Sequence, residues 1–132
     1  MYASATAIVR MAREGLERFP NSVLQNGGID SKKIYKAGKA GDELALEVFK
    51  TMGDYLGVGL ANLMNTLGPE VIVIGGGVAN AWDLFEPHMI AQVQTRAFTS
   101  LAKRVPIRPA ECGDNAGLLG AAKLAFDFEL LN

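Results

Sequence analysis

Apolar positions recur at helical spacing through the first half of the chain and then change to a short unbroken run. The helical spacing predicts three helices, at residues 4–19, 32–39 and 42–67. Ser4, Ser31 and Asp42 stand where N-caps belong. The third helix has an apolar stripe wide enough to predict burial over most of its surface.

Three glycines interrupt that third helix: Gly53, Gly57 and Gly59. Each costs a helix about 1 kcal/mol relative to alanine. Glycines kept at that cost indicate a close backbone contact, and we expect the partner to be another helix. Gly68-Pro69 ends the helix.

Residues 71–74 are all β-branched and do not alternate with polar residues, which predicts a strand buried on both faces of a parallel sheet. A helix is expected at 83–98, with Pro87 in its first turn. Residues 105–111 alternate and contain prolines that suit an edge strand. A last helix is expected at 114–128. The order predicts a right-handed parallel β-α-β unit. Because two strands make a thin sheet, we expect further strands from another chain or a larger protein.

Composition and charge narrow the class of protein. The 132 residues are 49% hydrophobic, and 13 basic and 14 acidic residues give a net charge of −1. This balance argues against a surface that binds nucleic acid. No apolar run is long enough to span a bilayer, so we expect no membrane partner. Cys112 and His88 are the only residues of their types, which excludes an internal disulfide and a Cys/His zinc site. A cytoplasmic setting is expected.

The most informative stretch is the glycine triplet, Gly75 to Gly77, directly after the predicted strand. Backbone without side chains at a strand's carboxyl end lets a ribose or phosphate approach, and the amides of the next helix favour negative charge. The triplet fits neither the P-loop pattern nor the G-x-G-x-x-G pattern, which needs glycine at position 80, where Asn80 stands. A tight turn without a ligand therefore stays an alternative. We take the triplet and Val78 as candidate ligand-binding residues.

The last helix is rich in small residues, which fits either a hinge or a close helix crossing; they are Ala116, Gly117, Gly120, Ala121 and Ala122. Among the aspartates only Asp114 is kept as a candidate ligand-binding residue, because it begins this helix on the ligand side. Asp42 and Asp83 are interpreted as helix caps, and Asp54 as a surface residue. Neither His88 nor Cys112 is expected to be catalytic, and Cys112 is expected to be buried.

Four segments together resemble the C-terminal part of ROK-family sugar kinases, and of the bacterial glucokinases among them in particular. They are Gly41-Asp42-Glu43-Leu44-Ala45, Asn62-Leu63-Met64-Asn65, residues 69–78 around the glycine triplet, and Gly117-Leu118-Leu119-Gly120-Ala121-Ala122. The resemblance implies an α/β fold, the C-terminal portion of an RNase H-like (actin-like ATPase) domain, over residues 1–132 as a single partial domain. It implies that the triplet belongs to the adenosine motif and that the cofactor is ATP with Mg²⁺.

The resemblance also implies what these residues do not carry. The family's phosphate-binding Asp-Gly motif, its catalytic base and its zinc-binding cysteine cluster are expected upstream of Met1. No catalytic residue and no metal ligand is therefore assigned, and the zinc of the family would not bind to this chain. The residue at position 68 is glycine, where the family usually has Asn or Asp. Whether the chain is an enzyme by itself stays open. Glucose is expected to bind only together with the missing half.

Three hypotheses follow. The first is a nucleotide-side fragment of an ATP-dependent glucokinase, inactive alone, whose complete form makes glucose 6-phosphate. The second is a fragment of the effector domain of a ROK-type sugar-responsive repressor. The third is a non-catalytic fragment that assembles with itself, because unpaired sheet edges and apolar faces recruit a second copy. A homo-oligomer is expected.

Overall fold

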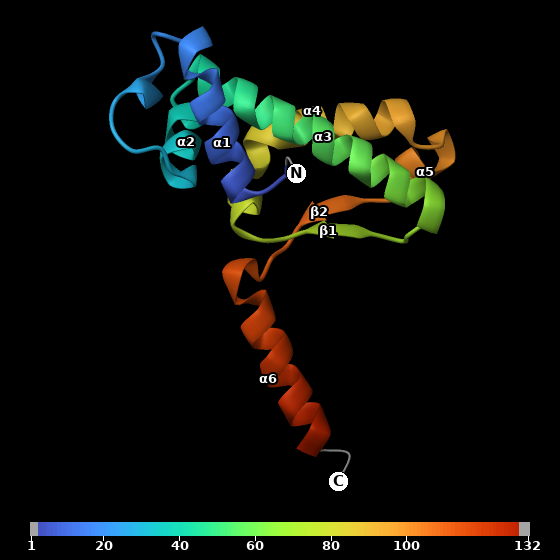
Figure 1. Cartoon of the computed structure of the whole chain (residues 1–132). Coiled ribbons are helices and arrows are strands. Elements are labelled where there is room, and N and C mark those ends of the chain that lie inside the picture. Colours follow the sequence, from blue (N-terminus) through green and yellow to red (C-terminus); the bar gives the residue numbers. More distant parts are fainter. Residues whose placement is uncertain (1–2, 130–132) are drawn as a thin grey trace.

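The computed structural model describes residues 3–129. Figure 1 shows a body of helices above a small sheet, with the last helix extending away from both. The helices and strands are α1 (Ala5–Gly15), α2 (Ser31–Lys39), α3 (Glu43–Leu67), β1 (Ile72–Ile74), α4 (Trp82–Arg96), α5 (Thr99–Arg104), β2 (Ile107–Pro109) and α6 (Ala116–Glu129). Four 3-10 turns are interspersed: η1 (Leu16–Arg18), η2 (Val23–Gln25), η3 (Gly77–Ala81) and η4 (Gly113–Asn115).

Of the four predicted helix caps, those at Ser4 and Asp42 are confirmed. The Ser4 hydroxyl accepts a hydrogen bond from the Ala7 amide at 3.1 Å, and Asp42 Oδ1 accepts one from the Ala45 amide at 3.0 Å. The prediction for Ser31 is wrong. Asp30 caps α2, with Oδ1 at 2.7 Å from the Lys33 amide, and Ser31 is the first helical residue. Both residue types are good N-caps, so local sequence does not distinguish them.

The close contact predicted from the glycines of α3 is confirmed for two of the three. A Cβ on Gly53 would lie 2.6 Å from the Phe85 carbonyl oxygen, and one on Gly57 would lie 2.4 Å from that of Met89. Both neighbours are backbone atoms of α4, so the two helices cross with almost no space between their main chains. Gly59 has open space where its Cβ would stand, and the prediction is wrong there.

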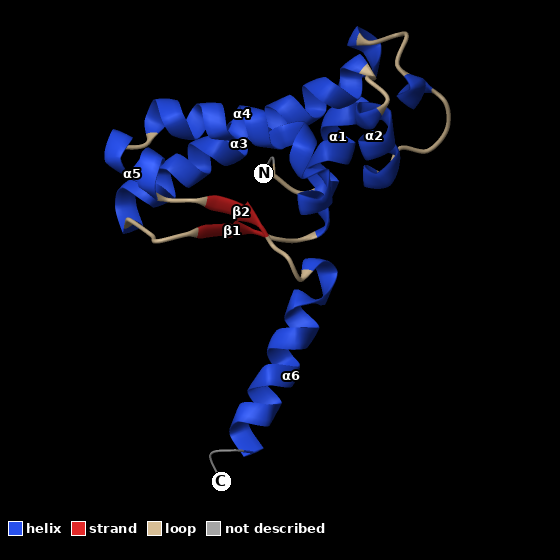
Figure 2. Cartoon of the chain, turned by 180° about the vertical axis from the view of Figure 1, so that it is seen from behind, coloured by secondary structure: helices blue, strands red, loops and turns tan. Residues whose placement is uncertain are grey.

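The parallel β-α-β unit is confirmed. β1 pairs in parallel with β2 in the register Ile72↔Ile107 and Ile74↔Pro109, and the Ala110 amide donates to the Ile74 carbonyl at 2.8 Å. In both views the helical body covers one face of this sheet (Figures 1 and 2). Val73 is 59% exposed, so the prediction that β1 is buried on both faces is wrong for the part of the chain that the structure describes.

α4 and the segment after it differ from the prediction in two ways. α4 begins at Trp82, which makes Pro87 its sixth residue and places it in the second turn. The missing proline amide therefore removes one hydrogen bond of the helix. The helix ends at Arg96, two residues earlier than expected, because Ala97 is extended, and a short helix that was not predicted, α5, follows it.

Asn65, near the end of α3, holds the junction between α4 and α5 in place. Its side-chain amide donates to the Arg96 carbonyl at 3.0 Å, and its side-chain oxygen accepts from the Phe98 amide at 2.8 Å. The two bonds satisfy backbone groups that the end of α4 leaves without helical partners. A side chain of α3 thus fixes where α4 ends and α5 begins.

α6 has few neighbours among the described residues. It points away from the body in both views (Figures 1 and 2). Several of its large apolar side chains are exposed, among them Leu118 at 72% and Leu124 at 70%. Across residues 3–129, no helix is both long enough and apolar enough to cross a membrane.

Candidate functional site

The glycine triplet forms the turn between β1 and η3. Gly76 has φ +90°, a conformation that residues with a side chain rarely adopt. A Cβ on Gly76 or Gly77 would meet open space, and one on Gly75 would only touch Ala110 at 3.5 Å. A tight turn accounts for glycine at position 76 alone. The bare backbone at Gly77 is left uncovered by the protein, as a bound ligand would require.

A hollow of about 310 Å³ opens beside the triplet, and we call it the α2 slot. It is lined by Ala5, Ile8, Ser31, Lys32, Tyr35, Phe49, Gly77, Val78, Asn80 and Ala81. Its floor is apolar, because Ile8, Phe49 and Ala81 are buried. Polar groups come from Ser31, Lys32 and Tyr35 on α2 and from Asn80 on η3. Such a hollow, with an apolar floor and a few polar groups, suits a flat heterocyclic ring.

A second hollow, of about 230 Å³, lies on the other side of Val78. Its lining includes Gly75, Met52 and Phe85 and contains neither a charged nor a hydroxyl-bearing side chain. Val78 lines both hollows, and the glycine triplet contributes to both. The structure thus brings the predicted residues Gly75, Gly77 and Val78 together at two cavities. That they bind a ligand stays a prediction.

Asp114 belongs to η4, which packs beside η3. The two turns follow β1 and β2, and parallel strands place their carboxyl ends at the same edge of a sheet. The backbone of Asp114 is therefore near the triplet, as expected. Its side chain lies outside what the structure describes, so its proposed part in ligand binding stays a prediction.

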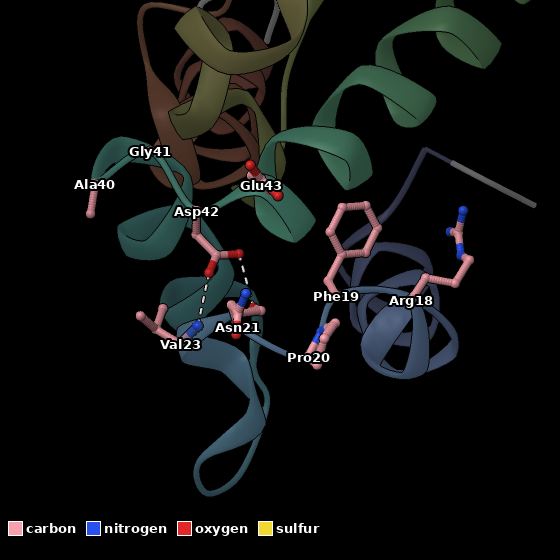
Figure 3. A pocket seen from close by; sticks show the side chains of 10 residues that line it. Arg18, Phe19, Pro20, Asn21, Val23, Ala40, Gly41, Asp42 and Glu43 are labelled. Carbon is pink, nitrogen blue, oxygen red and sulfur yellow. Dashed lines mark hydrogen bonds between the residues drawn. The ribbon is translucent and has the colours of Figure 1, made fainter.

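A third hollow, of about 540 Å³, lies where the loop after η1 meets the start of α3 (Figure 3). Asp42, which lines this hollow, accepts three hydrogen bonds. Its carboxylate accepts from the Val23 amide at 2.8 Å, the Ser22 hydroxyl at 3.0 Å and the Ala45 amide at 3.0 Å. Burial raises the pKa of Asp42, but these hydrogen bonds outweigh it, and the pKa lies below its usual value. Asp42 is a helix cap, as predicted, and holds the loop on α3.

Asp83 and Asp54 also make contacts between helices. Asp83 pairs with Lys39 of α2, and the hydrogen bond to Asp83 raises the pKa of Lys39. Asp54 accepts from Lys50 at 2.9 Å and from Gln92 of α4 at 3.0 Å. Burial raises the pKa of Asp54, yet these bonds bring it below its usual value. Asp83 lies in the first turn of α4 and does not cap it through its side chain, which corrects the prediction.

Cys112 is exposed, which contradicts its expected burial. His88 is partly buried where α4 crosses Gly53 of α3. Within residues 3–129, no three Asp, Glu, His or Cys side chains gather closely enough to hold a metal ion. What sequence reasoning missed is the α2 wall of the slot, Ser31, Lys32 and Tyr35. No local pattern marks these residues, because they meet η3 only in the fold.

Comparison with known proteins points to one family. The model of the ROK family matches residues 1–127. A glucokinase of Halalkalibacterium halodurans is 37% identical over 127 residues, which are 92% of this chain and 38% of that protein. A xylose repressor of Bacillus subtilis is 27% identical over 62% of this chain and 21% of its own length. The chain spans about two fifths of the length of the curated glucokinases that it matches.

Solved structures agree. A putative sugar kinase from Cytophaga hutchinsonii superposes with a TM-score of 0.85 at 28% identity, over 92% of this chain and 42% of that one. A ROK family glucokinase from Streptomyces griseus, in complex with glucose and AMPPNP, superposes with a TM-score of 0.76 at 29% identity, over 93% and 42%. These likenesses confirm the predicted fold class, an α/β unit of the actin-like ATPase fold.

Proposed function

We propose, since the chain belongs to the ROK family, that it forms the nucleotide-side part of an ATP-dependent glucokinase. The observation that carries this proposal is the glycine triplet. Its backbone at Gly77 is uncovered, it follows strand β1, and it opens beside a slot with an apolar floor. The Streptomyces griseus relative was solved with AMPPNP, which supports a nucleotide as the ligand.

In this proposal the nucleoside lies against the triplet, with its base in the α2 slot and its phosphates directed away from it. The slot offers an apolar floor for the ring and hydroxyl groups at its rim. Gly77 and Val78 let the ribose touch the main chain. ATP would bring Mg²⁺, which neutralises charge on the phosphates during transfer.

The complete enzyme would transfer the γ-phosphate of ATP to the 6-hydroxyl of glucose. That step needs a base beside the hydroxyl and a phosphate-binding loop. By resemblance, neither is carried by these 132 residues. We therefore expect this chain alone to form no glucose 6-phosphate in a coupled assay with ATP, Mg²⁺ and glucose.

Titration of the chain with AMPPNP and Mg²⁺ tests the proposal. Gly77→Val puts a side chain over the open backbone without clashing with the protein, so the fold should persist while AMPPNP binds at least about tenfold more weakly. Gly28→Val is the matched control, because Gly28 also has open space and lies in a loop outside both hollows. A wild-type chain that binds no AMPPNP, or a Gly77→Val variant that binds as well as wild type, would contradict the proposal.

A second candidate function is supported by the regulators among the relatives. A ROK family transcriptional regulator superposes with a TM-score of 0.75 at 26% identity, over 82% of this chain and 28% of its own. The chain would then be part of a sugar-responsive effector domain. A folded chain that binds no AMPPNP would favour this candidate over the kinase.

A further inference from the structure

The two walls of the α2 slot come from separate parts of the chain. One wall is η3, which follows β1 and runs directly into α4. The other is the outer side of α2, through Ser31, Lys32 and Tyr35. The width of the slot therefore depends on how α2 is docked relative to η3 and the start of α4.

Two contacts join the end of α2 to the start of α4. Lys39 forms an ion pair with Asp83, which is the second residue of α4. Beside it, a Cβ on Gly38 would lie 2.9 Å from Leu84 Cδ1, so the backbone of α2 approaches that side chain closely. Lys39 is one helical turn beyond Tyr35, so the contacts act directly next to the wall.

From this placement we infer that the Lys39–Asp83 ion pair, with the Gly38–Leu84 contact, is a positioning device. It holds α2 as the outer wall of the slot and so sets how tightly the nucleoside part of the ligand binds. The inference rests on the proposed function for the identity of the ligand. The docking of α2 itself does not depend on that identity.

The rest of α2 is anchored independently of the ion pair. Ile34 is fully buried and Ala37 is 5% exposed, so the inner face of α2 belongs to the core. Loss of the ion pair should therefore leave α2 folded and change only how firmly its end is held. Both charged side chains are about half exposed, at 51% and 48%. Exposed ion pairs contribute little, so the effect on binding should be small and specific.

The variant Lys39→Met tests the inference, with Lys36→Met as its matched control. Lys36 is exposed in the same stretch of α2 and has the same charge, and it forms none of the ion pairs found among the described residues. Lys39→Met should lower the affinities for AMPPNP and for adenosine by the same factor, about threefold. Lys36→Met should leave both affinities unchanged, and Lys39→Arg should retain wild-type binding, because it keeps the ion pair.

Equal loss for adenosine and AMPPNP would place the effect at the nucleoside, as inferred. Loss for AMPPNP alone would show that the lysine acts on the phosphates through its charge, and would overturn the inference. Equal loss in Lys36→Met would overturn it as well.

Hydrogen exchange of the free chain tests the docking without a ligand. Lys39→Met should speed amide exchange at the end of α2, while α3 and α4 keep their protection and Lys36→Met behaves as wild type. Unchanged exchange in α2 would overturn the positioning role. If the wild-type chain binds neither AMPPNP nor adenosine, the proposed function is wrong, and so is the inferred effect of the ion pair on nucleoside binding. The exchange result still decides separately whether the ion pair docks α2.

Discussion

The crossing of α3 with α4 and the exposed helix α6 use the same kind of sequence with opposite results. Gly53 and Gly57 stand four residues apart in α3, and Gly117 and Ala121 stand four apart in α6. In α3 the small residues admit the backbone of α4 to within van der Waals contact. In α6 the positions of Gly117 and Gly120 face open space. Small residues at this spacing thus permit a close crossing, but a partner helix must be present to make it.

The large side chains show the same contrast. In the body, Phe85 is 1% exposed and Met89 is fully buried. In α6, Phe126 is 67% exposed and Leu118 is 72% exposed. Matched substitutions in the two regions should therefore have very different effects on the free energy of unfolding.

The largest effect is expected from truncating a phenylalanine. Phe85→Ala should lower the free energy of unfolding by about 4 kcal/mol, because it removes a buried ring and leaves a cavity. Phe126→Ala should change it by less than about 0.5 kcal/mol. Urea unfolding should be followed by circular dichroism rather than by fluorescence. The ring centroids of Phe85 and Trp82, the only tryptophan, are 5.5 Å apart, so removing the Phe85 ring would change the tryptophan fluorescence directly. A cost above about 2 kcal/mol for Phe126→Ala would show that α6 is packed in solution.

Adding one methyl group should change stability by a smaller amount. It should destabilise the crossing of α3 with α4 and stabilise α6. Gly57→Ala places Cβ 2.4 Å from the Met89 carbonyl oxygen and should destabilise by about 2–3 kcal/mol, because α4 must move. Gly120→Ala meets nothing and should raise the helix content of α6, since alanine is favoured by about 1 kcal/mol. Thermal unfolding and circular dichroism measure both. A neutral Gly57→Ala would mean that the two helices are further apart than described.

The smallest effect concerns polar contacts. Asp42→Ala removes the cap of α3 and should cost about 1 kcal/mol. Lys123→Met in α6 breaks an exposed pair with Asp127 and should cause no measurable change. Since the pKa of Asp42 is lowered in the folded chain, its contribution is present above the ordinary value of 3.8 and is lost as the pH falls below that value. Urea unfolding at neutral pH and at low pH should therefore show a difference between wild type and Asp42→Ala that shrinks in acid.

The helices and the parallel unit followed from periodicity and from strong end signals. Asp42, with a wide apolar stripe behind it, and Gly68, which adopts a left-handed conformation at φ +55°, mark the two ends of α3 without tertiary information. α5 was missed because six residues are too few to show a period. The exposure of Val73 was missed because a β-branched run indicates only that a strand favours burial. Whether other residues cover both faces of the sheet depends on the rest of the fold.

The candidate site was predictable on one side only. Gly75, Gly76 and Gly77 are adjacent in sequence and follow a strand, so a local pattern marks them. Tyr35 and Lys32 reach the same hollow from α2, which lies much earlier in the chain. A single amphipathic helix does not reveal which outward residues face a cavity. The Lys39–Asp83 pair, 44 residues apart in sequence, was hidden for the same reason.

We expect the side-chain amide of Asn65 to influence the order in which the elements fold. It bonds to backbone groups 31 and 33 residues further along the chain, at the turn that sends the polypeptide back toward β2. We expect these bonds to form once α3 has formed and before β2 aligns with β1, because β2 lies beyond that turn in the chain. Non-local pairing of short strands is slow because the loop must close before any contact rewards it. If α3 forms first and holds the turn, less chain has to be ordered before β2 meets β1. The amides of the sheet should therefore be the last to acquire protection from hydrogen exchange during refolding.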